Sequence, residues 1–186
     1  MNEDSFYLIT VSSHKNADEF FKKFKREVDQ AAKGKACVMR AQLPDNDSIM
    51  VQIYPHHLVY HNLSVDHTTA IVTSLFGDAP LELINHPDAY IDNLATLLHM
   101  NMQVTESNIC GKCSPCRIGG PLIADLLMQY NNTQASTDTT TAIERNQQLL
   151  DVGYTMKNAS MCAIGMFGAD PLLFAMDKWH QYFQQA

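Results

Sequence analysis

Short apolar runs and one helical stripe alternate along the first third of the chain. The run 6–11 (FYLITV) is rich in β-branched and aromatic side chains, which predicts a buried strand. The next apolar side chains recur every three or four residues, as on one face of a helix: Phe20, Phe21, Phe24 and Val28. The charges between them fall mostly on the opposite face, which indicates a solvated helix surface, and Gly34 predicts the end of the helix.

Further apolar runs predict three more strands, over 36–43, 49–54 and 58–60, separated by polar and proline-containing turns. A second helix is expected between Ser64, which can cap it, and Gly77. A helix after the first strand, then an antiparallel hairpin and a closing helix, is the arrangement of a small thioredoxin-like sheet.

The second half of the chain predicts only helices. Apolar stripes at helical spacing cover four segments, 87–98, 115–127, 141–154 and 170–183. Pro87 and Pro115 suit first helical turns, whereas Gly119-Gly120-Pro121 predicts a later start or a kink in the second of these helices. The expected fold class is therefore α+β: a small thioredoxin-like α/β domain over residues 1–80, followed by an all-α four-helix bundle over residues 81–186.

The composition is that of an ordinary globular protein, with 46% hydrophobic and 18% charged residues. The net charge of −7 argues against a nucleic-acid or anionic-membrane surface. Neither a signal peptide nor a run of roughly 18 apolar residues is visible. We therefore expect a cytoplasmic protein with no nucleic-acid partner and no direct membrane insertion. In that compartment clustered cysteines more often bind metal than form disulfides.

Four of the five cysteines fall in two places. Cys110, Cys113 and Cys116 follow the spacing C-x2-C-x2-C, and Cys162 lies 46 residues beyond the third. A [4Fe-4S] cluster needs four thiolates, and three at this spacing can wrap one side of such a cube while the fourth closes it from elsewhere. A zinc site with four thiolates and a redox disulfide are the alternatives. Zinc more often uses two C-x2-C pairs, and a C-x-x-C disulfide would leave two cysteines without a role.

The sequences CGKCSPCR (110–117) and MCAIG (161–165) resemble the iron-sulfur domain of the NADH-binding flavoprotein subunit of complex I. The same module occurs in NAD-linked hydrogenases and formate dehydrogenases. The resemblance covers roughly residues 85–185, favours a cluster over zinc, and implies a helical bundle with one [4Fe-4S] cluster. The ligands that it implies are Cys110, Cys113, Cys116 and Cys162.

Residues 51–76 are similar to the closing strand pair and helix of thioredoxin-like [2Fe-2S] ferredoxin domains. That family holds its cluster with two pairs of cysteines, whereas the matching regions here contain none, and Cys37 alone cannot replace them. The resemblance implies a domain without a cluster that serves in docking or packing, with Cys37 as a small buried apolar residue. Nearby histidines are expected in turns and on strand surfaces rather than as metal ligands: His56, His57, His61 and His67.

No glycine-rich loop that could cradle FMN or NADH phosphates is visible, so we expect no FMN or NAD site in this chain. No Ser-His-Asp order, paired catalytic carboxylates or H-E-x-x-H motif is visible either. The leading hypothesis is a non-catalytic electron-transfer subunit of an oxidoreductase complex. Its partner would be a flavoprotein subunit that oxidises NAD(P)H, or a hydrogenase or formate dehydrogenase subunit.

The alternative hypothesis is a structural adaptor, in which the cluster or a zinc ion only holds the bundle together. Lys112 and Arg117 flank the expected ligands. They either raise the reduction potential as nearby cations, or are solvated or paired with a neighbouring subunit, and the sequence leaves both possibilities open.

Overall fold

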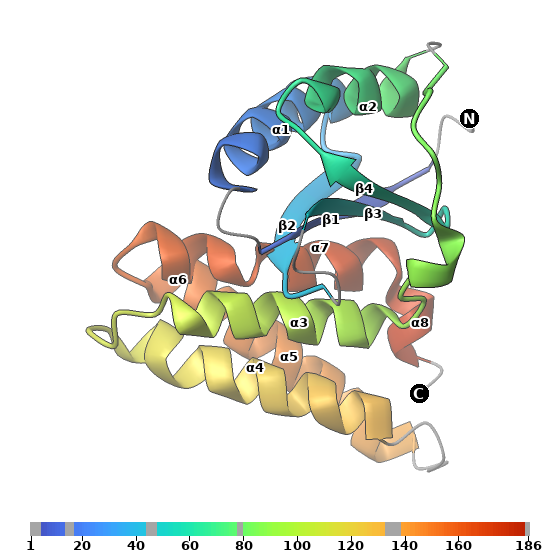
Figure 1. Ribbon diagram of the computed structural model, residues 1–186. Coiled ribbons are helices and arrows are strands. Elements are labelled where there is room, and N and C mark those ends of the chain that lie inside the picture. The colour runs from blue at the N-terminus through green and yellow to red at the C-terminus, as the bar shows by residue number, and fades with distance from the viewer. Residues whose placement is uncertain (1–4, 14–16, 44–47, 78–79, 133–138, 185–186) are drawn as a thin grey trace. The chain divides into compact units, whose positions relative to one another are not determined.

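The first strand, β1 (Tyr7–Ser12), lies between a parallel and an antiparallel neighbour. It pairs in parallel with β2 (Ala36–Ala41) and antiparallel with β3 (Ile49–Tyr54), and β3 pairs antiparallel with β4 (Leu58–Leu63). The result is a mixed four-stranded sheet in the order β2-β1-β3-β4 (Figure 1). The sheet and the many helices make this an α+β protein, as the sequence predicts.

This computed structural model describes residues 5–13, 17–43, 48–77, 80–132 and 139–184. The chain divides into two compact units, residues 1–92 and 93–186, and each is described by itself. Among the described helices, none combines the length and the apolarity that crossing a bilayer requires.

Helices α1 (Ala17–Ala32) and α2 (His67–Phe76) cover one face of the sheet (Figure 1). Of the apolar stripe predicted for α1, Phe20, Phe24 and Val28 are buried, whereas Phe21 is only partly buried. Gly34 follows the helix in the left-handed region, with φ +83°. The core of this unit joins side chains of both helices to one face of the strands, including Ile9, Val11, Phe20, Phe24, Val28, Val51, Ile53, Ile71 and Leu75.

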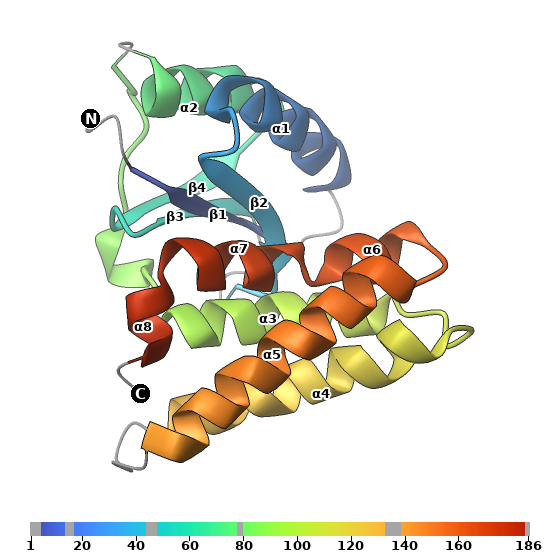
Figure 2. The same ribbon diagram turned by 180° about the vertical axis from the view of Figure 1, so that it is seen from behind.

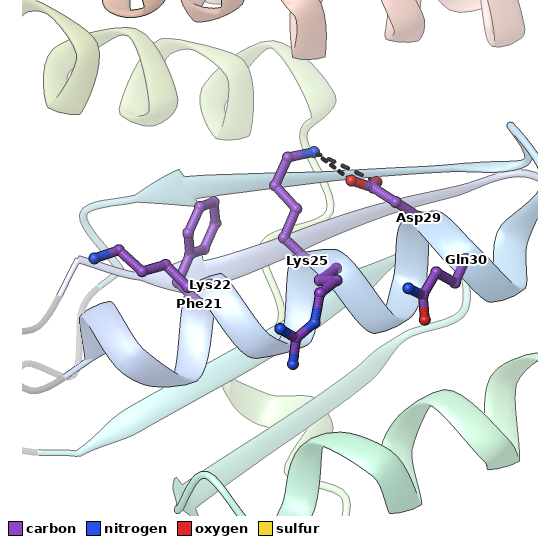
Figure 3. Close-up of a pocket in the computed structure, with 6 residues that line it drawn as sticks. Phe21, Lys22, Lys25, Asp29 and Gln30 are labelled. Carbon is purple, nitrogen blue, oxygen red and sulfur yellow. Dashed lines mark hydrogen bonds and ion pairs between the residues drawn. The ribbon is translucent and has the colours of Figure 1, made fainter.

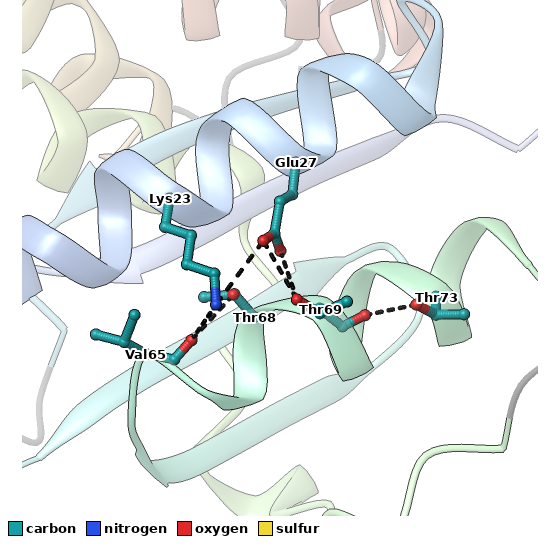
Figure 4. Close-up of polar contacts among 6 residues, drawn as sticks. All are labelled: Lys23, Glu27, Val65, Thr68, Thr69 and Thr73. Atoms are coloured by element: carbon teal, nitrogen blue, oxygen red, sulfur yellow. Dashed lines mark hydrogen bonds and ion pairs between the residues drawn. The ribbon is translucent and has the colours of Figure 1, made fainter.

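Polar side chains link the two helices on the outer side of this core (Figure 4). The Lys23 ammonium donates to the Val65 carbonyl at 3.0 Å, and the Thr69 hydroxyl donates to the Glu27 carboxylate at 3.2 Å. The helix α2 begins after Asp66 rather than after Ser64. Ser64 was therefore wrongly predicted as the cap.

The segment after α2 runs back along the sheet and belongs to the first unit. The Val59 N–H donates to the Asn85 side chain at 2.8 Å. The Gln52 side chain exchanges two hydrogen bonds with the Ile91 backbone, at 2.8 and 3.0 Å. These bonds hold residues 85–91 against β3 and β4, because buried strand groups need partners.

The second unit consists of helices only: α3 (Leu94–Ser107), α4 (Ser114–Asn132), α5 (Thr139–Ala159), α6 (Ala163–Gly168), α7 (Asp170–Lys178) and α8 (His180–Gln184). Helix α4 packs against both α3 and α5 (Figures 1 and 2). The Tyr182 hydroxyl donates to the Asn93 side chain at 3.0 Å, which ties α8 to the start of α3. Asn93 also caps α3 by accepting from the Thr96 N–H at 2.9 Å.

Several predicted helix limits in this unit are wrong. Pro87 begins a short 3-10 turn, Pro87–Ala89, and α3 starts seven residues later, after its Asn93 cap. The last predicted helix is interrupted at Trp179, which separates α7 from α8. The descriptions of the two units as thioredoxin-like and as a four-helix bundle stay predictions.

The glycine pair in α4 reflects close packing rather than a late helix start. The helix begins at Ser114 and continues through Gly119, Gly120 and Pro121. A methyl group at Gly119 would lie 2.7 Å from Cγ of Met156 on α5, and one at Gly120 would lie 2.8 Å from Cδ1 of Ile109. Both contacts are with side chains, so a methyl group at either position would require the Met156 or Ile109 side chain to shift.

Candidate metal centre

The three clustered cysteines lie in the turn between α3 and α4. The backbone bends at Gly111, whose φ of +74° lies in the left-handed region that favours glycine. Cys110 is exposed, whereas Cys113 and Cys116 are buried, with Cys116 in the first turn of α4. The short turn thus leaves one thiol exposed to solvent and buries the other two.

Arg117 braces this turn. Its guanidinium donates to the Gly111 carbonyl at 3.2 Å, across the loop, and its backbone N–H donates to the Cys113 carbonyl at 3.2 Å. The Arg117 side chain therefore has a structural partner inside the loop. The sequence suggested that Arg117 either raises the reduction potential or is solvated or paired with a neighbouring subunit. It did not predict this contact within the loop.

The two buried thiols are in contact, with 3.5 Å between the Sγ atoms of Cys113 and Cys116. The Met161 backbone N–H and the Cys116 thiol, each hydrogen bonded to Cys113, lower the pKa of Cys113. Burial raises the pKa of Cys116 to about 11, and the nearby thiols of Cys113, Cys162 and Cys110 add to the rise. The thiols of Cys110, Cys113 and Cys162 therefore all lie within electrostatic reach of Cys116.

Cys162 returns to this place from the far end of α5. It occupies the position before α6, with an extended backbone (φ −143°, ψ 164°), and its carbonyl accepts from the Met166 N–H at 3.0 Å. Gly165, one turn into α6, lies against α4: a methyl group there would be 2.9 Å from Cβ of Cys116 and would overlap the Ser160 side chain. This close approach brings Cys162 to the other three cysteines.

The comparisons with known proteins concern the same part of the chain. Residues 96–186 match the family described as the NADH-ubiquinone oxidoreductase-F iron-sulfur binding region. That part of the chain is similar to this family. The match includes all four cysteines, confirms the resemblance found in the sequence, and supports an iron–sulfur cluster.

A curated relative is the NADP-reducing hydrogenase subunit HndC of Solidesulfovibrio fructosivorans, which is 23% identical over 124 residues. The aligned segment is 66% of this chain but only 23% of the relative, so the chain spans less than a quarter of that subunit's length. No solved structure matches the chain.

The arrangement of the thiols bears on whether this region could hold a single ion or a cluster. Over the described residues, no three His, Cys, Asp or Glu side chains converge as the ligands of one metal ion would. Cys113 and Cys116 are a buried pair in contact, Cys110 is exposed and Cys162 is partly buried. Four thiolates match the number and type of ligands that an iron–sulfide cube needs. Because each thiolate binds a different iron atom, the Sγ atoms of Cys113 and Cys116 would move apart when such a cube binds.

Apolar side chains are exposed around the return turn of the iron–sulfur binding region. Met161 is 82% exposed and Phe167 is 60% exposed, although both lie within five residues of Cys162. Ile164 and Met166 are 41% and 40% exposed. Large apolar side chains grouped on a surface mark contact sites for other macromolecules.

The remaining candidate residues lie in the first unit. Cys37 is only partly buried in β2, not fully buried as predicted. The rings of His57 and Tyr90 lie 4.4 Å apart, and those of His61 and His86 lie 4.8 Å apart. The planes of these ring pairs are inclined by 38° and 69°, so the histidines pack against other rings at an angle.

A shallow groove of about 460 Å³ lies along the exposed side of α1 (Figure 3). Lys25 and Asp29 pair within it, with 3.3 Å between the ammonium and a carboxylate oxygen. The residues that line the groove include no thiol and no hydroxyl group. It is the solvated helix surface that the charge pattern predicts.

Three groups around the thiols were not predicted from the sequence: the Met161 backbone N–H, the Ser160 hydroxyl and Gly165, which leaves no room for a side chain. Their only signal was position, since all three lie within three residues of Cys162. Their contacts with α4 depend on how the helices pack, which no local pattern reveals.

Proposed function

We propose that this chain relays single electrons through one [4Fe-4S] cluster held by Cys110, Cys113, Cys116 and Cys162. The observation that carries the proposal is that the thiols of Cys110, Cys113 and Cys162 all lie within electrostatic reach of Cys116, in a region that matches an iron–sulfur family. When bound, such a cluster accepts one electron and returns it without any bond to carbon or hydrogen being made or broken.

The protein groups around the thiols favour the negative form that iron requires. The Met161 N–H donates to Cys113, and Arg117 places a positive charge on the loop that carries three of the four cysteines. Both interactions stabilise thiolates, and both also stabilise the added charge of a reduced cluster. Arg117 could therefore raise the reduction potential as a nearby cation, as one interpretation of the sequence suggested, while it also donates to the Gly111 carbonyl.

We further propose that the chain works inside a cytoplasmic, multi-subunit oxidoreductase linked to NAD(P). The relative is named as a subunit of an NADP-reducing hydrogenase. A flavoprotein that oxidises NAD(P)H, or a hydrogenase or formate dehydrogenase subunit, would then supply and receive the electrons. In this proposal the flavin and nicotinamide sites lie on another polypeptide, and the exposed apolar side chains near Cys162 face a partner.

The first unit is proposed to be a thioredoxin-like packing or docking domain without a cluster. Cys37 is the only cysteine among residues 1–92, and a cluster in this family type needs four ligands. The domain division proposed from the sequence, residues 1–80 and 81–186, assigns all the ligands to the second domain.

One observation favours the structural alternative. Two thiolates bound to a single zinc ion at about 2.3 Å stand about 3.8 Å apart, close to the 3.5 Å between Cys113 and Cys116. A zinc ion would hold the helices together and would carry no electron. The test of the main proposal must therefore measure the metal itself.

The experiment is anaerobic purification and reconstitution, followed by iron, sulfide and zinc analysis and by EPR spectroscopy after reduction. We expect about four iron and four sulfide per chain and a reducible signal. Replacing any one of the four proposed ligands with Ala should abolish both, whereas Cys37→Ala is the matched control and should retain them. A colourless protein with stoichiometric zinc and no reducible signal would establish the structural alternative instead.

A further inference from the structure

Ser160 carries a buried hydroxyl group without a defined role. It lies in the turn between the end of α5 at Ala159 and the start of α6, two residues before Cys162. Its backbone N–H donates to the Met156 carbonyl at 3.2 Å, so the backbone at Ser160 is fixed by α5. Its Oγ atom is shielded from solvent, and within the part of the chain that the structure describes it completes no hydrogen bond.

The position of this hydroxyl is defined by two helices. A methyl group at Gly165 of α6 would overlap the Ser160 side chain and would also lie 2.9 Å from Cβ of Cys116 on α4. Ser160 is therefore packed against the same point as one of the buried thiols. Since buried hydroxyl groups are normally paired, an unpaired one beside four thiols indicates an acceptor that belongs to this site.

Cys113 is the acceptor within reach. Ser160 and Cys116 pack against the same point of Gly165, and the Cys116 Sγ atom lies 3.5 Å from that of Cys113. In keeping with this packing, the Met161 N–H and, as a smaller contribution, the Ser160 hydroxyl lower the pKa of Cys113. A bound cluster would hold the Cys113 sulfur as a thiolate, which is a much stronger hydrogen-bond acceptor than a neutral thiol.

We propose that the Ser160 hydroxyl donates a hydrogen bond to the Cys113 thiolate when the cluster is bound, and thereby raises the reduction potential of the cluster. The inference rests on the proposed function. Adding an electron increases the negative charge on the ligand sulfurs, so a donor to one of them stabilises the reduced form more than the oxidised form. Ser160 is thus a tuning residue that acts through a ligand.

The expected size of the effect is about a tenfold change in the equilibrium constant for reduction. For a one-electron couple this corresponds to a shift of about 59 mV. Ser160→Ala should therefore lower the potential by about that amount, while the iron content stays unchanged. Ser107→Ala is the matched control, because its hydroxyl donates to the Val104 carbonyl at 2.8 Å on the exposed end of α3.

The experiment is an anaerobic redox titration of the reconstituted full chain, followed by EPR. Ser160→Thr and Ser160→Val form a second matched pair. Their new side chains have nearly the same shape, but only that of Thr carries a hydroxyl group. This pair replaces the first comparison if Ser160→Ala does not load with iron. Proton ENDOR spectra recorded in light and heavy water should also lose one exchangeable coupling in the variants without a hydroxyl.

The outcomes separate the two proposals. A lower potential in the hydroxyl-free member of each loaded pair, with Ser107→Ala unchanged, supports the role of Ser160. A loaded cluster whose potential does not depend on the hydroxyl overturns that role and leaves the electron-relay proposal standing. A wild-type chain that takes up no iron overturns both.

Discussion

Adding one methyl group at Gly165 tests the helix contact that brings Cys162 to the other cysteines. In Gly165→Ala the new Cβ would overlap Ser160 and approach Cβ of Cys116 to 2.9 Å. The Cβ atoms of Ser160 and Cys116 both lie one bond from the backbone, so side-chain rotation cannot move them away from the new methyl group. Relief of the overlap therefore requires α6 to move relative to α4, and Cys162 to move with it.

The magnitude follows from the cost of inserting a methyl group into a packed interior, about 1–3 kcal/mol. Glycine-to-alanine changes inside helices also gain about 1 kcal/mol of helix propensity, and this gain must be removed from the comparison. Gly153→Ala on α5 provides the reference, because its Cβ would meet only the tip of the Leu173 side chain, at 3.0 Å, which can turn away. The difference between the two variants isolates the overlap.

The assay is thermal unfolding of both variants, with iron analysis after reconstitution. For a unit of about 90 residues, 1 kcal/mol shifts the melting temperature by roughly 4–8 °C. We expect Gly165→Ala to melt roughly 5–20 °C below Gly153→Ala and to bind less iron. Equal melting temperatures and equal iron contents would refute the reasoning, because α6 would then approach α4 less closely than described.

Three further predictions concern the same unit. Arg117→Ala removes a hydrogen bond across the cysteine loop, worth about 1 kcal/mol. A chelator should therefore extract iron from this variant roughly fivefold faster than from the wild type. Lys112→Ala, in the same loop, is the control and should leave the extraction rate unchanged. In the metal-free protein at pH 8, alkylation should modify the exposed Cys110 well before Cys116. The Cys116 pKa of about 11 leaves about one part in a thousand of that thiol as the reactive thiolate. Equal alkylation rates by mass spectrometry would contradict this prediction. Burial raises the pKa of Glu106, so the contribution of its carboxyl group to stability is greatest at low pH and falls as the pH rises through that pKa. Glu106→Gln should therefore have a higher melting temperature than the wild type at pH 7. This difference should shrink near pH 4.

The elements that follow from local patterns were predictable from the sequence. The strand Ile49–Tyr54 has the predicted limits, and α1 differs from its prediction only at the ends. In both cases the apolar period matches the buried face. Pro87 misled the prediction because proline fixes a φ angle that suits a 3-10 turn as well as an α-helix, and the true cap, Asn93, stands further along the chain.

The features that depend on distant contacts were not predictable. Gly119 and Gly120 resemble a helix interruption in sequence, and only the positions of Met156 and Ile109 explain them. The same holds at the site. The cysteine spacing indicated the donor set, whereas the burial of two thiols and the hydroxyl of Ser160 result from the packing of α4, α5 and α6.

The 46-residue separation of Cys116 from Cys162 has a consequence for the lifetime of the protein. Any group bound to both residues cross-links the chain, and closing a loop of this length lowers the entropy of the unfolded chain by an amount worth about 4 kcal/mol at 25 °C. A whole domain is commonly stable by only about 5–15 kcal/mol. Oxidative loss of the bound group would therefore remove a large share of that margin at one step. A chain that has lost its redox centre would unfold more often and become a substrate for proteases, so damage to the centre and removal of the protein would be directly coupled.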